Sequence, residues 1–85
     1  MKTVKLIYKD NKDKELFELL EFNVPVFIDY INMNTLNGIK EGRKILGYYG
    51  TSKVPFIEIL EDNQRIPFYS ENGNPIYQIK NYLNG

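Results

Sequence analysis

The sequence predicts an α/β protein with the element order β-α-β-α-β-β-α. Two observations support this order. Short runs of β-branched and aromatic residues, typical of strands, alternate with longer stretches whose apolar residues recur at helical spacing. The chain of 85 residues also contains no repeat, linker or low-complexity segment, so we expect one domain over residues 1–85.

The first strand and helix are predicted from a short apolar run and the polar residues after it. Residues 4–8 are mostly apolar, as in a strand buried on both faces. Asp10 or Asn11 can cap a helix over about residues 12–22, which Asn23 then ends. The apolar stripe of this helix is Leu16, Phe17, Leu19 and Leu20.

The second strand and helix follow the same alternation. Residues 24–31 are rich in β-branched and aromatic side chains and predict a strand. Asn34 or Thr35 can cap a helix over about residues 35–48, and Gly50 can end it. Its apolar residues are Leu36, Ile39, Leu46 and Tyr49. Close packing against the sheet would explain its internal glycines, which are Gly38, Gly42 and Gly47.

The last part of the chain predicts a hairpin and a helix. Residues 55–60 and 65–69 read as strands, joined by a turn around Asp62 and Asn63, two residue types that tolerate unusual backbone angles. Pro75 suits the first turn of a final helix over about residues 75–83.

The predicted sheet is mixed, with four strands in the order 2-1-3-4 and helices on both faces. A right-handed crossover makes the first two strands parallel neighbours, and the hairpin adds two antiparallel strands. Proline cannot donate to a sheet ladder, so it belongs at edges or strand starts. Pro25 and Pro55 begin strands, and Pro67 lies in the fourth strand, an edge, so all three agree with this order.

Composition excludes several classes of site. The chain has no cysteine and no histidine, so it can form no disulfide and no thiolate or Ser-His nucleophile, and we expect no metal or other cofactor. The 11 basic and 11 acidic residues cancel and are interspersed along the chain, which argues against a nucleic-acid partner. The sequence contains no apolar run of membrane-spanning length and no signal-peptide core, so we expect a cytoplasmic protein without a membrane partner.

The segment Thr51-Ser52-Lys53-Val54-Pro55, placed between a helix and a strand, resembles the cis-proline corner of the thioredoxin superfamily, glutaredoxins especially. The helix before it and the closing run of residues 66–71 occupy the places that the family order requires. The resemblance implies a thioredoxin-like fold with a cis bond between Val54 and Pro55. It also implies that the backbone of Val54 meets an extended peptide or glutathione, whose carboxylate Ser70 and Glu71 would hold.

Three departures from the glutaredoxin pattern argue against glutathione. The redox cysteine is missing, and the loop after the first strand is shorter and consists of Lys9-Asp10-Asn11-Lys12. Pro67-Phe68 stands in place of the family's Gly-Gly pair, so two side chains would crowd the glutathione pocket. The resemblance therefore implies a degenerate member without redox activity.

Taken together, these observations predict a non-catalytic binding or assembly module with a protein partner. The candidate binding residues are Lys12, Val54, Pro55, Tyr69, Ser70 and Glu71. The corner is a better candidate than the edge strand, where Pro67 removes a donor and Arg65 adds charge. A cysteine-free enzyme that binds glutathione or resembles its transferases is the alternative. The abundance of residues with AT-rich codons, such as Ile, Asn and Lys, also leaves open a phage-encoded structural or accessory protein within a virion.

Overall fold

The computed structural model describes residues 1–69 and 74–84. Its helices and strands follow the predicted order β-α-β-α-β-β-α. They are β1 (Lys2–Tyr8), α1 (Asn11–Glu18), β2 (Val26–Asn32), α2 (Leu36–Tyr49), β3 (Phe56–Glu61), β4 (Gln64–Tyr69) and α3 (Pro75–Asn84).

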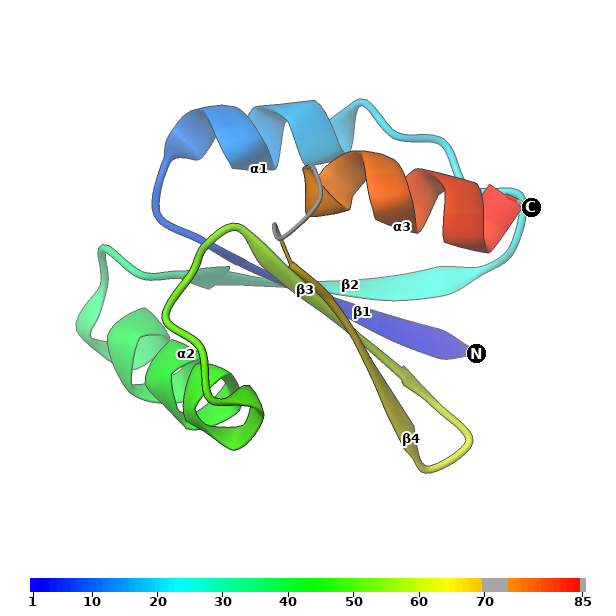
Figure 1. Cartoon of the computed structure of the whole chain (residues 1–85). Coiled ribbons are helices and arrows are strands. Elements are labelled where there is room, and N and C mark those ends of the chain that lie inside the picture. The colour runs from blue at the N-terminus through cyan, green and yellow to red at the C-terminus, as the bar shows by residue number, and fades with distance from the viewer. Residues whose placement is uncertain (70–73, 85) are drawn as a thin grey trace.

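The four strands form one mixed sheet in the order β2-β1-β3-β4, which confirms the prediction. β1 runs parallel to β2 and antiparallel to β3, and β4 is antiparallel to β3. Helices α1 and α3 lie on one face of the sheet, and α2 lies on the other (Figure 1). This is the β-α-β-α-β-β-α topology that the sequence predicts. Pro25 and Pro55 each precede the first residue of a strand by one position.

Two hydrophobic clusters fill the spaces between the sheet and its helices. The larger cluster joins β1 and β3 to α1 and α3, and its buried residues are Val4, Leu6, Tyr8, Phe17, Ile57, Ile59, Ile76, Ile79 and Leu83. The smaller cluster joins the opposite face to α2, and its buried residues are Ile7, Ile31, Ile45, Leu46 and Phe56. Alternate residues of β1 and β3 thus enter different clusters, as the two faces of a strand require.

The β3–β4 hairpin has a two-residue turn at Asp62 and Asn63, within the predicted connection of residues 61–64. Asp62 and Asn63 have φ angles of 48° and 66°, the left-handed values that such a turn needs at both central positions. Counted from this turn, the backbone groups of Arg65, Pro67 and Tyr69 point away from β3. The nitrogen of Pro67 therefore lies on the open edge of the sheet, at a position where β4 donates no hydrogen bond to β3.

Helix α1 is shorter than predicted. The sequence predicts an end at Asn23, but α1 ends at Glu18 with Leu19 as its C-cap, and Leu19 is 79% exposed instead of buried. The reason is a tertiary contact with the end of α3. The side chain of Asn84 donates to the carbonyl oxygen of Glu21 (2.6 Å) and accepts from the N–H of Asn23 (2.8 Å), so this segment bonds to α3 and not to its own helix.

Helix α2 has the predicted ends. Thr35 is its N-cap, and the Thr35 hydroxyl oxygen accepts a hydrogen bond from the N–H of Gly38. Gly50 is the C-cap, with a φ of 69° that favours glycine. Leu36, which the sequence places on the buried face, is 88% exposed because it lies in the first turn, beyond the edge of the apolar contact.

Two glycines let α2 approach the last residue of β2 and the residue after it. A Cβ atom on Gly38 would collide with the backbone carbonyl of Asn32, and one on Gly42 would collide with the sulfur of Met33. The predicted reason for these glycines, close packing, is therefore confirmed at both positions. It is wrong at Gly47, where a Cβ atom would meet nothing within 4 Å.

Candidate functional site

The predicted corner stands at one end of the sheet. The peptide bond between Val54 and Pro55 is cis, as the resemblance implies. The register pairs Ile7 with Phe56, so the corner lies beside the C-terminal end of β1. The loop from β1 into α1 leaves from the same end (Figure 1).

Val54 and Tyr69 pack into the cluster beneath α2. The ring of Tyr69 stacks on that of Phe56, with centroids 5.5 Å apart and planes 9° from parallel. Val54, Pro55 and Tyr69 are all half-buried, so each keeps part of its surface open. Within the described part of the chain, the N–H and C=O of Val54 have no hydrogen-bond partner. The structure thus brings Val54, Pro55 and Tyr69 together around Phe56.

Lys12 is placed separately, in the first turn of α1. The Asp10 carboxylate accepts a hydrogen bond from the Lys12 N–H (3.0 Å), which makes Asp10 the predicted helix cap. The Lys12 side chain is exposed and bonds to no residue that the structure describes. The predicted site residues Ser70 and Glu71 lie outside the described residues.

A second group of polar side chains, absent from the predicted site, surrounds Glu58. Glu58 lies in the middle of β3 and is only 1% exposed. One of its carboxylate oxygens, Oε2, accepts hydrogen bonds from the Tyr49 hydroxyl (2.5 Å) and from Nε of Arg65 (2.8 Å). The Arg65 guanidinium lies 3.7 Å from the ring centroid of Tyr48. We call Tyr48, Tyr49, Glu58 and Arg65 the Glu58 cluster.

The electrostatics of the Glu58 cluster explain how a carboxylate is tolerated in a central strand. A buried charge is costly unless it is paired and hydrogen-bonded, and Glu58 has both kinds of partner. Burial and the hydrogen bond to Glu58 raise the pKa of Tyr49. The hydrogen bond to Glu58 also raises the pKa of Arg65. Both donors therefore keep their protons at neutral pH, and the arrangement is suited to hold Arg65 in one orientation.

The sheet face that carries Glu58 has an apolar row of side chains and, two residues away along each strand, a mostly charged row. Strand register aligns an apolar row under α2, made of Ile31, Ile7, Phe56 and Tyr69. The adjacent row on the same face is mostly charged and consists of Asp29, Lys5, Glu58 and Pro67. Opposite charges on neighbouring strands favour this pairing. α2 covers the apolar row, and its flank meets the charged one.

A groove lies between that flank of α2 and the charged row. It has a volume of about 280 Å³ and is lined by Lys5, Glu41, Lys44, Ile45, Tyr48 and Arg65. One signal in the sequence could have drawn attention to this region, namely a single glutamate inside the apolar run Phe56–Leu60. A charge in a central strand needs a partner from another element, and the sequence alone does not say which.

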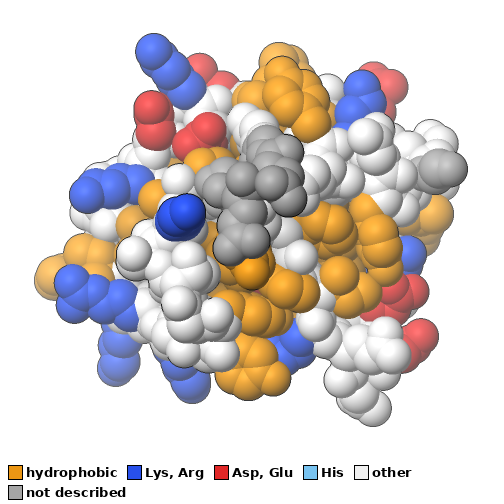
Figure 2. Space-filling model, viewed as in Figure 1, with side chains coloured by type: hydrophobic (Ala, Val, Ile, Leu, Met, Phe, Trp, Pro, Cys, Tyr) orange, Lys and Arg blue, Asp and Glu red, His pale blue; other side chains and the backbone are white. Residues whose placement is uncertain are grey.

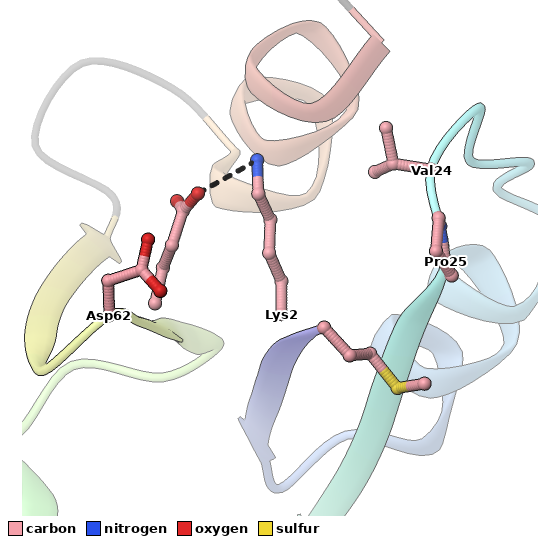
Figure 3. Close-up of a pocket in the computed structure, with 6 residues that line it drawn as sticks. Lys2, Val24, Pro25 and Asp62 are labelled. Carbon is pink, nitrogen blue, oxygen red and sulfur yellow. Dashed lines mark ion pairs between the residues drawn. The ribbon is translucent and has the colours of Figure 1, made fainter.

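A second hollow, of about 220 Å³, lies at the opposite end of the sheet from the corner (Figure 3). Lys2 points across it toward the hairpin, where it forms an ion pair with Glu61 (3.5 Å), while Val24 and Pro25 form the other side (Figure 3). Both charged side chains are about one-third exposed, so water weakens their attraction. Lys2 and Glu61 largely satisfy one another, and this hollow offers no convergent set of free polar groups.

Among residues 1–69 and 74–84, no group of three or more acidic side chains could hold a metal ion. No helix within these ranges is both long and apolar enough to cross a membrane. No known protein-family model matches the sequence, and no curated protein matches it significantly. The structure therefore defines the class of the protein, a small α/β domain with a four-stranded mixed sheet. The glutaredoxin-like relationship stays a prediction.

Proposed function

We propose that this protein is a non-catalytic binding module that holds an extended segment of a protein partner at the cis-proline corner. The main support is Val54, whose N–H and C=O are unpaired within the described part of the chain. An extended segment that runs antiparallel to this residue can exchange two hydrogen bonds with it, as in strand addition. Binding through these backbone hydrogen bonds requires no reactive side chain.

The surroundings of Val54 suit a peptide. The ring of Tyr69, which is stacked on the buried ring of Phe56, is partly open to solvent and provides an apolar surface near Val54. Tyrosine is enriched among the residues that dominate protein interfaces. Lys12, exposed at the start of α1, would add a charge for an acidic residue of the partner. Disulfide exchange is excluded from this proposal because the chain has no cysteine.

The test is a random peptide library panned against the immobilised protein, followed by binding measurements with individual peptides. We expect the selected peptides to shift the backbone amide of Val54 in ¹H–¹⁵N spectra. Methylation of one peptide nitrogen should then lower the affinity about tenfold, because it removes the N–H that pairs with the Val54 carbonyl. Peptides that shift only the amides of β4 or α3, or tolerate methylation at every position, would contradict the proposal.

Two variants refine the test. Lys12→Gln should weaken the binding of acidic peptides without a change in thermal stability, since the side chain is exposed and unpaired among the described residues. Lys80→Gln, which removes an exposed lysine on α3, is the matched control and should bind as the unmodified protein does. Reduced glutathione is the second ligand to titrate. Saturable binding of glutathione at Val54 would favour the alternative, a cysteine-free glutathione-dependent enzyme.

A further inference from the structure

The orientation of Arg65 is determined by two partners. Its Nε donates to the buried Glu58 carboxylate (2.8 Å), and its guanidinium carbon lies over the ring of Tyr48, 3.7 Å from the centroid. Apart from Glu58 and the Tyr49 hydroxyl, no described residue hydrogen-bonds to the guanidinium, which leaves donors on its two terminal nitrogens unused. With Nε bonded to Glu58 and one face against Tyr48, the guanidinium can still donate through its two terminal nitrogens. Two such donors match two oxygens of an oxyanion.

Two lysines from other elements line the same groove. Lys5 comes from β1 and Lys44 from α2, and with Arg65 of β4 they surround a volume of about 280 Å³. Neither lysine forms an ion pair with any described residue. Lys5 stands between Asp29 and Glu58 in the strand register, yet its ammonium pairs with neither.

The charges around the groove favour an anion. Glu41 is the only carboxylate among the lining residues that the structure describes, against Lys5, Lys44 and Arg65. Glu58 lies behind Arg65 and already accepts two hydrogen bonds. The groove is also on the basic side of the molecule, where the exposed surface of α2 adds Lys40 and Arg43. Figure 2 shows Lys and Arg side chains gathered at the lower left, where α2 lies.

We propose that this groove binds the phosphate group of a small phosphate monoester. A phosphate monoester carries between one and two negative charges at neutral pH and offers three acceptor oxygens, which suits three cations that approach from three elements. The volume is near the lower limit for small-ligand sites, which favours a compact ligand over a nucleic-acid strand. Tyr48, with a small exposed part of Ile45, adds apolar surface to the lining for the rest of the ligand. The groove includes none of the corner residues, so this site is separate from the proposed peptide site.

The test uses inorganic phosphate and phenyl phosphate as probes, with benzoate as the carboxylate counterpart and sodium chloride at equal ionic strength as the reference. We expect saturable shifts of the backbone amides of Lys44, Tyr48 and Arg65 with both phosphates. Phenyl phosphate should bind several-fold more tightly than benzoate, because benzoate brings a single charge and two oxygens. Equal shifts with chloride at the same ionic strength, or tighter binding of benzoate, would overturn the proposal.

Single substitutions test whether the phosphate binds in this groove. Lys5→Gln and Lys44→Gln should each weaken phenyl phosphate binding about tenfold, a loss of about 1.4 kcal/mol. Lys80→Gln changes the net charge by the same amount outside the groove and should leave the affinity unchanged. Arg65→Lys keeps the charge but lacks the planar pair of donors, so we expect it to weaken binding as well, with circular dichroism to verify its fold. If the two groove variants bind as the unmodified protein does, or if Lys80→Gln weakens binding equally, the groove is not a phosphate site.

Discussion

The hydroxyl of Tyr49, at the end of α2, donates a hydrogen bond to the buried carboxylate of Glu58 in the central strand β3. This contact is a polar link between α2 and the sheet, and it lies outside the apolar cluster that the two share. Because Glu58 also accepts from Arg65, one carboxylate connects α2, β3 and the edge strand β4. The candidate groove depends on this connection, since it determines where Arg65 points.

Replacement of Glu58 by alanine should strongly destabilise the protein. The change leaves Tyr49 and Arg65 without their acceptor, and we expect a loss of about 3 kcal/mol in the free energy of unfolding. Glu58→Gln should cost less, because the amide oxygen can still accept from Tyr49. Urea unfolding followed by circular dichroism measures both values. Glu61→Ala is the control, since its partly exposed ion pair with Lys2 contributes about 1 kcal/mol or less. Equal losses for Glu58→Ala and Glu61→Ala would contradict this account.

Stability should fall at alkaline pH through Tyr49. Burial and the hydrogen bond to Glu58 raise the pKa of this phenol above its ordinary value of 10.0. The unfolded chain therefore releases this proton at a lower pH than the folded chain does. The stabilisation is complete below pH 10.0 and is lost as the pH rises above that value.

Tyr49→Phe isolates this effect, because phenylalanine has no proton to release. We expect the variant to lose about 1 kcal/mol at neutral pH, where the hydrogen bond is missing, and to show a shallower decline above pH 10.0. Urea midpoints measured at neutral and alkaline pH give both quantities. Parallel declines for the two proteins would show that Tyr49 does not cause the pH dependence.

Pro67 should protect the edge of the sheet from self-association. Its nitrogen lies at a position whose backbone groups point away from β3, so Pro67→Val leaves the β3–β4 ladder intact and adds an outward N–H donor. We expect a change in stability of about 1 kcal/mol or less and a concentration-dependent increase in mass by analytical ultracentrifugation. Thr3→Val, on the central strand β1, is a control that adds no edge donor. A monomeric Pro67→Val protein at high concentration would contradict this role.

The glycines of α2 should respond to alanine in opposite directions. Gly47→Ala places a methyl group in open space, so we expect a gain of up to about 1 kcal/mol from helix propensity. Gly38→Ala pushes the methyl group into the Asn32 carbonyl, so α2 must move and stability should fall in spite of the better propensity. Thermal unfolding of the two variants makes the comparison. A gain for both would mean that Gly38 is not required for the close approach.

The order of elements could be predicted because each element has a local pattern. The caps Asp10, Thr35 and Gly50 each lie next to the helix that they end, and the Asp62-Asn63 turn is determined by the two residues themselves. The Val54–Pro55 corner was predicted for the same reason, since its motif is a continuous stretch of sequence. The end of α1 could not be predicted in this way, because Asn84 at the far end of the chain decides it.

The Glu58 cluster was not predicted because its members come from three different elements. Glu58 is one residue of an apolar strand, and only the packing of α2 and the register of β4 give it Tyr49 and Arg65 as partners. The distribution of charge has a similar origin. Acidic and basic residues are interspersed along the chain, but the sheet separates α1 from α2. Acidic residues outnumber lysines by three to two on α1, whereas α2, on the opposite face, has three basic residues and one glutamate.

By itself the sequence determined the class of fold and the corner, because backbone preferences, side-chain periodicity and turn chemistry act between residues near in the chain. The strand order could also be predicted, because the handedness of the crossover and the placement of proline restrict it. It also determined that no thiol chemistry is possible, since no cysteine is present. Tertiary structure alone decided that Glu58 is buried and paired, that Lys5, Lys44 and Arg65 share one groove, and that Leu19 and Leu36 face solvent. Burial and pairing depend on which elements pack together. This packing is determined by the strand register and by the positions of the helices.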